Sequence, residues 1–134
     1  MRILYAIQGT GNGHMSRAMD VAPALMQHGQ VDYMVSGAQA DIQLPYEVKY
    51  RSKGLSFFVG KNGGIDLQKT FQRNSSRRVI QEIRQFPIEQ YDLVINDFEP
   101  ITAWAAKWKR KKVVALSHQS ALLSDKCPKP KSID

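Results

Sequence analysis

Three polar segments of this 134-residue chain follow apolar runs that are typical of buried strands. His14 comes after the first run, and Asp97 follows the run that begins at Leu93. A third run is followed by Ser117, His118 and Gln119. An imidazole can accept a proton near neutral pH, and a carboxylate on its other ring nitrogen fixes the tautomer and stabilises the imidazolium. These residue types predict general-base chemistry by His14 with Asp97 as its partner; a loop-capping histidine and a turn-forming aspartate are the alternatives.

The segment between the first run and His14 is rich in glycine, and it consists of Gly9, Thr10, Gly11, Asn12 and Gly13. Such a loop lets the backbone approach a ligand closely, and the helix that follows offers free N–H groups that favour phosphate. His14 stands where the dinucleotide-binding pattern needs its third glycine, and no Gly-Lys-Ser/Thr follows. A nicotinamide or flavin site is therefore weakly supported, and the phosphate loop of nucleotide hydrolases is absent. A different nucleotide-dependent enzyme that uses this glycine loop stays an alternative.

Apolar runs that alternate with amphipathic segments predict the elements that position these groups. The sequence predicts strands over 2–8, 31–36, 46–50, 93–96 and 113–116. It predicts helices over 15–26, 66–85 and 100–108, a helical or irregular piece over 37–43, and a short strand or loop over 55–59. Pro23 predicts a kink or break, and Pro100 suits a first helical position, before which Glu99 can favour the helix N-terminus.

This alternation is typical of an α/β domain, with a Rossmann-like parallel sheet and helices on both faces. We expect one domain over 1–125, followed by a loop or linker over 126–134. In the usual 3-2-1-4-5 strand order, the first strand lies beside the strand that precedes Asp97. His14 and Asp97 are then expected at adjacent strand ends, where ligands bind in such sheets.

Composition excludes several classes of protein. Apolar residues make up 43% and charged residues 23% of the chain, which is typical of a globular domain and excludes disordered, collagen-like and coiled-coil chains. The single cysteine, Cys127, excludes an internal disulfide and favours a reducing compartment. No apolar run approaches the roughly 20 residues that span a bilayer. We expect a cytoplasmic location, with peripheral contact at the inner membrane face as a further option.

The net charge of +7 comes largely from two basic clusters in the second half of the chain. They consist of Lys69, Arg73, Arg77, Arg78 and Arg84, and of Lys107, Lys109, Arg110, Lys111 and Lys112. Trp104 and Trp108 lie on one helical stripe beside the second cluster. This pattern is consistent with a helix at a membrane surface, or with a core helix whose tryptophans cover the sheet. The clusters themselves are either solvated faces or binding surfaces for anionic ligands.

The three motifs resemble those of GT-B glycosyltransferases. The stretch 9–14 is similar to the glycine loop of the peptidoglycan N-acetylglucosaminyltransferase and UDP-sugar transferase group, although Asn12 stands where the peptidoglycan enzyme has a glycine. The stretches 92–100 and 113–119 resemble the later aspartate site and the turn that closes the acceptor domain. The resemblance spans about residues 1–120.

This resemblance implies an amino-terminal, acceptor-binding half of a two-domain, metal-independent enzyme. His14 would be the general base and Asp97 its partner. The remaining candidates for binding the acceptor or its phosphate are Gly9, Thr10, Gly11, Asn12, Gly13, Glu99, His118 and Gln119. No cofactor is expected, and the nucleotide-sugar co-substrate would bind a donor domain or subunit that 134 residues cannot include. Alone, the chain is expected to be inactive.

We therefore expect the acceptor domain of a nucleotide-sugar-dependent glycosyltransferase. Its partners would be a glycosyl acceptor, including a lipid-linked one, and the missing donor domain. Nucleic acid is not an expected partner under this hypothesis. The alternative is a non-catalytic basic α/β module that binds a phosphorylated ligand or nucleic acid.

Overall fold

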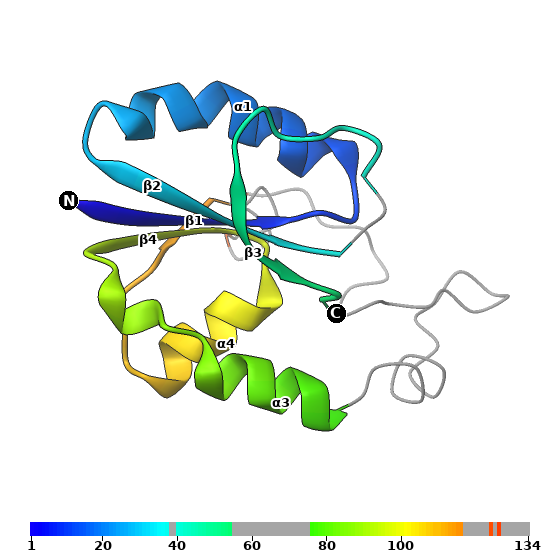
Figure 1. The fold of residues 1–134 in the computed structure, drawn as a ribbon, viewed down its shortest axis with the longest axis vertical. Coiled ribbons are helices and arrows are strands. Elements are labelled where there is room, and N and C mark those ends of the chain that lie inside the picture. Colours follow the sequence, from blue (N-terminus) through cyan, green and yellow to red (C-terminus); the bar gives the residue numbers. More distant parts are fainter. Residues whose placement is uncertain (38–39, 55–75, 117–123, 125, 127–134) are drawn as a thin grey trace, which may run out of the picture.

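A five-stranded parallel sheet organises the computed structural model of the protein, which describes residues 1–37, 40–54, 76–116, 124 and 126 (Figure 1). The strands are β1 (Arg2–Gln8), β2 (Gln30–Ser36), β3 (Val48–Ser52), β4 (Leu93–Asp97) and β5 (Val114–Ala115). The helices are α1 (Asn12–Met26), α3 (Ser76–Gln85) and α4 (Pro100–Trp108), with a 3-10 turn η1 (Ile88–Gln90). The strand order β3-β2-β1-β4-β5 confirms the predicted Rossmann-like α/β class.

The central strand β1 is buried from Ile3 to Gln8 because helices cover both faces of the sheet. On one face α1 packs over Ile3, Tyr5 and Ile7, and on the other α3 and α4 pack over Leu4 and Ala6 (Figure 1). The alternation of side chains along a strand assigns these residues to opposite faces. Both faces are apolar, which explains the continuous apolar run in the sequence.

The register of the central strands places the two predicted polar groups together. β1 pairs in parallel with β4, and Ile7 lies opposite Asp97. The chain that leaves β1 therefore turns into the glycine loop directly beside the end of β4. From this loop the chain enters α1 at Asn12.

Several predicted boundaries differ from the structure. β3 begins at Val48, two residues later than predicted, and β5 includes only Val114 and Ala115. α1 continues through Pro23 to Met26, so the predicted break is wrong. Pro23 is exposed and lies in the last turn of α1. The one backbone hydrogen bond that proline removes is therefore lost near the end of the helix, away from the core. The predictions for 55–59 and for 66–75 concern residues outside the described ranges.

The interpretation of Trp104 and Trp108 as side chains covering the sheet is wrong. Their exposed fractions are 53% and 63%. α4 instead packs Ile101, Ala105 and Ala106 against the sheet. Ile80 of α3 is also 53% exposed. Within the described ranges, no helix is long and apolar enough to cross a membrane.

Candidate active site

The glycine loop is held tightly against β2. The backbone N–H of Gly9 donates to the Ser36 carbonyl at 2.6 Å. A Cβ at Gly9 would lie 2.7 Å from Val35 Cγ1 and 3.0 Å from the same carbonyl, so this position has no room for a larger side chain. A Cβ at Gly11 or Gly13 would meet no described atom within 4 Å. The first glycine therefore serves packing, whereas the outer side of the loop is open to a ligand.

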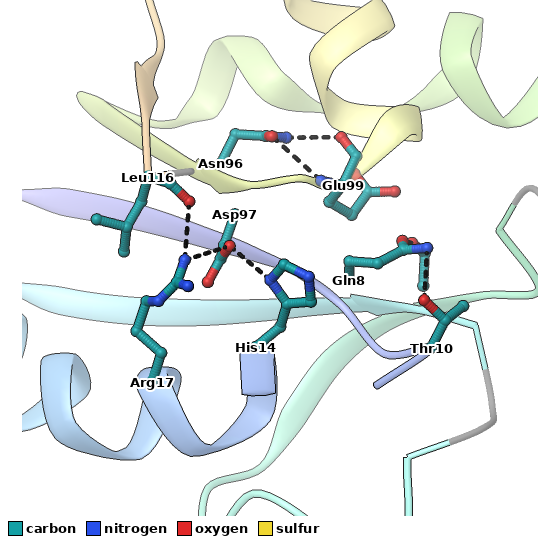
Figure 2. Close-up of polar contacts among 9 residues, drawn as sticks. Gln8, Thr10, His14, Arg17, Asn96, Asp97, Glu99 and Leu116 are labelled. Atoms are coloured by element: carbon teal, nitrogen blue, oxygen red, sulfur yellow. Dashed lines mark hydrogen bonds and ion pairs between the residues drawn. The ribbon is translucent and has the colours of Figure 1, made fainter. Parts of the chain in front are cut away.

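His14 lies in the first turn of α1, and Asp97 is the last residue of β4. Figure 2 shows the imidazole turned toward the carboxylate, with 2.8 Å between His14 Nδ1 and Asp97 Oδ1. Because an ionised carboxylate oxygen can only accept, Nδ1 donates this hydrogen bond, and in the neutral imidazole Nε2 then has no proton. The Asp97 side chain is fully buried, whereas the His14 side chain is 18% exposed. The predicted juxtaposition is confirmed, and it leaves Nε2 on the side of the ring away from Asp97.

Arg17 is a third member of this cluster that the sequence analysis missed. Its Nη1 atom donates to Asp97 Oδ1 at 3.0 Å and to the Leu116 carbonyl at 3.2 Å (Figure 2). Residues three apart share one face of a helix, so His14 and Arg17 reach the same carboxylate from α1. This spacing is visible in the sequence and could have indicated the residue.

Phe98 borders the imidazole and was also missed. Its ring is nearly parallel to that of His14, with an interplanar angle of 4° and 6.1 Å between the centroids. The backbone of Phe98 has a φ of 58°, in the left-handed region that costs roughly 1–2 kcal/mol for a residue with a side chain. The Phe98 side chain is nevertheless 49% exposed, so the turn directs an aromatic ring to solvent beside His14. No local pattern in the sequence indicates this conformation.

The turn after Asp97 is fixed by Asn96 and Glu99. Asn96 Nδ2 donates to the Glu99 carbonyl at 2.7 Å, and Asn96 Oδ1 accepts from the Glu99 backbone N–H at 3.2 Å (Figure 2). The Glu99 carboxylate accepts from the backbone N–H groups of Ile101 and Thr102, at 2.8 and 2.6 Å. Glu99 is thus the N-cap of α4, and Pro100 is its first residue as predicted.

Burial raises the pKa of the Glu99 carboxyl, although the hydrogen bonds from the cap oppose this effect. The side chain is fully buried and its oxygens are occupied by the cap. This placement agrees with the helix-capping interpretation of Glu99. The structure does not bring the Glu99 carboxylate into the His14–Asp97 pair.

A known family accounts for these elements. The family model for glycosyl transferase family 1 matches residues 1–133. This chain belongs to glycosyl transferase family 1. The match is consistent with the amino-terminal domain of a GT-B glycosyltransferase, and so is the parallel sheet with helices on both faces. No curated protein and no solved structure showed a significant match.

Two other loop residues of this glycosyltransferase domain organise the loop from within. Thr10 Oγ1 accepts from Gln8 Nε2 at 3.1 Å (Figure 2), and Gln8 Oε1 accepts from the Ser36 hydroxyl at 2.9 Å. Asn12 Oδ1 accepts from the backbone N–H groups of Asp41 and Ile42, at 2.9 and 3.4 Å. Asn12 thereby connects the start of α1 to the segment before β3. The binding roles of both residues stay predictions, and His118 and Gln119 lie outside the described residues.

A cavity of about 550 Å³ begins at this loop, at the carboxyl ends of β1, β2 and β3. Its lining includes Gly9 and Met15, the latter directly after His14 in the sequence. Apolar side chains make up much of the wall, and two exposed cations, Arg51 and Lys53, also line it. The carboxyl ends of parallel strands are where α/β sheets bind ligands, so the cavity is a candidate ligand site.

Proposed function

We propose that this domain binds the acceptor of a nucleotide-sugar-dependent glycosyltransferase and supplies its general base, His14. The observation that carries the proposal is the 2.8 Å contact between His14 Nδ1 and the buried Asp97 carboxylate. This contact fixes the tautomer in which Nε2 is free to accept a proton.

In the proposed reaction, Nε2 of His14 removes the proton of an acceptor hydroxyl as its oxygen attacks the anomeric carbon of the donor. The new glycosidic bond forms while the bond to the nucleoside diphosphate breaks, and the diphosphate leaves with the electron pair. His14 becomes an imidazolium, which Asp97 stabilises through the same hydrogen bond. In the two-domain arrangement that the family resemblance implies, the donor would bind the second domain.

The cavity beside the glycine loop supports the acceptor assignment. Its apolar wall would take a hydrophobic part of the acceptor, and Arg51 and Lys53 would attract a negatively charged group. His14 does not line the cavity itself, but Gly9 of the glycine loop and Met15 of α1 do, so the cavity borders the loop and the helix that carry the proposed base. An amphiphilic, anionic acceptor matches this wall better than a neutral polar sugar does.

The test uses the full-length protein, a panel of nucleotide-sugars and a lipid extract as the source of acceptors, and it measures nucleoside diphosphate release. His14→Ala should lower turnover at least about 100-fold, because general-base catalysis contributes about 10²–10⁴-fold. The matched control is His28→Ala, at an exposed position beyond the end of α1. Near-normal turnover of His14→Ala would remove His14 from the chemistry. Salt-sensitive nucleic-acid binding without any sugar transfer would favour the non-catalytic alternative.

We further propose that the outer face of α3 and α4 contacts an anionic membrane surface. We call this the tryptophan face, and it consists of Ile80, Arg84, Trp104, Lys107 and Trp108. These side chains line a groove of about 410 Å³. The guanidinium of Arg84 lies 5.1 Å from the Trp108 ring centroid, and Lys107 Nζ lies 4.9 Å from that of Trp104. Exposed tryptophans bordered by cations match both the acyl boundary and the charge of an anionic bilayer.

Vesicle binding tests this contact directly. The protein should bind phosphatidylglycerol vesicles and should not bind phosphatidylcholine vesicles. Replacing both Trp104 and Trp108 by alanine should weaken the partition at least about tenfold, since burying one large apolar side chain contributes about 1.5–3 kcal/mol. Met26→Ala removes a 51% exposed apolar side chain from the opposite face of the sheet and should change nothing. Equal partition of both variants would overturn the proposed contact.

A further inference from the structure

The Asp97 carboxylate has two cationic or potentially cationic neighbours that share one oxygen. Oδ1 accepts from His14 Nδ1 at 2.8 Å and from Arg17 Nη1 at 3.0 Å. Asp97 is fully buried, whereas the side chain of Arg17 is 22% exposed. A guanidinium is charged at every physiological pH, so Asp97 has a permanent counter-ion that does not depend on His14.

We propose that Arg17 is a positioning residue that balances the charge of Asp97 and thereby keeps the His14 imidazole ready to accept a proton. This inference rests on the proposed role of His14 as the base. It adds Arg17 to the histidine–aspartate pair as a residue that acts on His14 through Asp97.

The physical argument starts from the cost of a buried charge. A buried carboxylate needs a nearby cation or several donors to remain ionised. If His14 were the only neighbour, the resting enzyme would favour the imidazolium, because that form alone would neutralise Asp97. An imidazolium has no free lone pair and cannot act as a base. With Arg17 present the carboxylate is already paired, so the neutral imidazole costs less.

Arg17 also fixes the place of the carboxylate. The same Nη1 atom donates to the Leu116 carbonyl at 3.2 Å, and the Leu116 N–H donates to the Asn96 carbonyl at 2.8 Å. Arg17 therefore connects α1 to the ends of β4 and β5. Oδ1 of Asp97 is held toward the helix that carries His14, which preserves the hydrogen bond that selects the tautomer.

Three groups in the described structure, from three elements, are His14's partner Asp97 and the two other groups that interact with that carboxylate. They are Arg17 on α1, Asp97 on β4 and Tyr5 on β1. Burial and the negative charge of Asp97 raise the pKa of Tyr5, so its hydroxyl keeps its proton across the neutral range. Arg17 is thus the group in this set whose removal changes the charge that faces His14 without removing a hydrogen-bond partner of its ring.

The experiment is an NMR titration of the histidine ring signals in the chain described here, which requires neither donor nor acceptor. In Arg17→Gln, the midpoint of the His14 titration should rise by at least about half a pH unit, a threefold or larger change in its protonation equilibrium. Arg17→Lys keeps the charge, and its midpoint should stay within about 0.2 unit of the wild type. Arg77→Gln removes an equal charge from an exposed position on α3 and should have no effect. The exposed His28 is the internal reference in every sample.

An unchanged midpoint in folded Arg17→Gln would overturn the inference, and so would a rise in Arg17→Lys as large as that in Arg17→Gln. If Arg17→Gln does not fold, Arg17→Met keeps the apolar stem of the side chain and serves the same measurement. In the full-length enzyme, the acidic limb of the pH–rate profile should move to higher pH in Arg17→Gln and not in Arg17→Lys. A shifted titration without any sugar transfer would uphold the role of Arg17 and overturn the proposed function instead.

Discussion

Replacing Asp97 by asparagine tests the candidate site most directly, because it removes the charge and leaves the shape of the side chain. The amide oxygen can still accept from Arg17 Nη1 and from His14 Nδ1, which lie 3.0 and 2.8 Å from Oδ1 of Asp97. What is lost is the carboxylate that stabilises the imidazolium as the proton is transferred. The variant should therefore keep the geometry of the site and lose rate.

The size of this loss follows from the single charged hydrogen bond between the two side chains. A hydrogen bond to a charged group contributes about 1.5–3 kcal/mol and a neutral one about 0.5–1.5 kcal/mol. The difference of about 1–2 kcal/mol corresponds to a roughly 5- to 30-fold loss of turnover. His14→Ala, which removes the base itself, should cost at least about 100-fold.

Stability should also fall in Asp97→Asn. Asp97 Oδ2 is buried and has no hydrogen-bond partner among the described residues, so the new amide N–H₂ group would be placed where no described acceptor meets it. A buried unsatisfied donor costs about 1–3 kcal/mol. The free energy of unfolding should decrease by this amount in urea denaturation.

The assay is nucleoside diphosphate release by the full-length enzyme, carried out below the midpoint of unfolding for each variant. In the His14→Ala background, Asp97→Asn should cause no further loss of turnover, because Asp97 acts through the imidazole. Independent, additive losses would refute the histidine–aspartate mechanism. Unchanged turnover in folded Asp97→Asn would refute it as well.

Two further predictions concern stability. Gly9→Ala should destabilise the domain by about 1–3 kcal/mol, because the new Cβ would lie 2.7 Å from a β2 side chain. Gly13→Ala has open space at Cβ and should stabilise α1 by about 0.5–1 kcal/mol. Urea unfolding measures both changes, and equal effects would contradict the packing argument. The second concerns Asp32, which accepts hydrogen bonds from Lys49 and Tyr91 at 2.6 and 2.7 Å. Burial raises the pKa of the Asp32 carboxyl, but these hydrogen bonds outweigh burial and lower the pKa below its ordinary value of 3.8. A carboxyl with a lowered folded-state pKa stabilises the folded protein at pH values above its unfolded-state pKa. This contribution is lost as the pH falls through the folded-state pKa. Asp32→Asn should therefore cost about 1 kcal/mol in urea at pH 6 and less at pH 3, and an equal cost at both would contradict the ion pairing.

The strand order and the pairing of His14 with Asp97 were predictable from local patterns. Continuous apolar runs indicate strands that are covered on both faces, and amphipathic segments between them indicate crossover helices. Right-handed crossovers leave few possible strand orders, and the common one makes the first strand a neighbour of the strand that ends at Asp97. The juxtaposition followed from topology, without any information on side-chain contacts.

The outward direction of Trp104 and Trp108 was not predictable in the same way. Their stripe also includes Ile101 and Ala105, and a helical pattern shows which residues share a face without showing how much of it is buried. The structure buries Ile101, Thr102, Ala105 and Ala106, so the inward face of α4 is centred on these residues and the tryptophans stay exposed. The rotation of α4 about its own axis, which tertiary packing sets, decided this outcome.

The sequence by itself determined the α/β class, the order of the elements and the two residues of the proposed base, because these depend on periodicity and on short-range turn chemistry. Only the tertiary structure decided that Arg17 shares the carboxylate, that Phe98 takes a left-handed conformation beside His14, and that Glu99 caps a helix instead of facing the pair. Each of these depends on distances between residues that are brought together by the fold, or on a backbone angle that the neighbouring residues impose. Local patterns contain the candidates for such contacts, and the packing of α1 and α4 against the sheet selects among them.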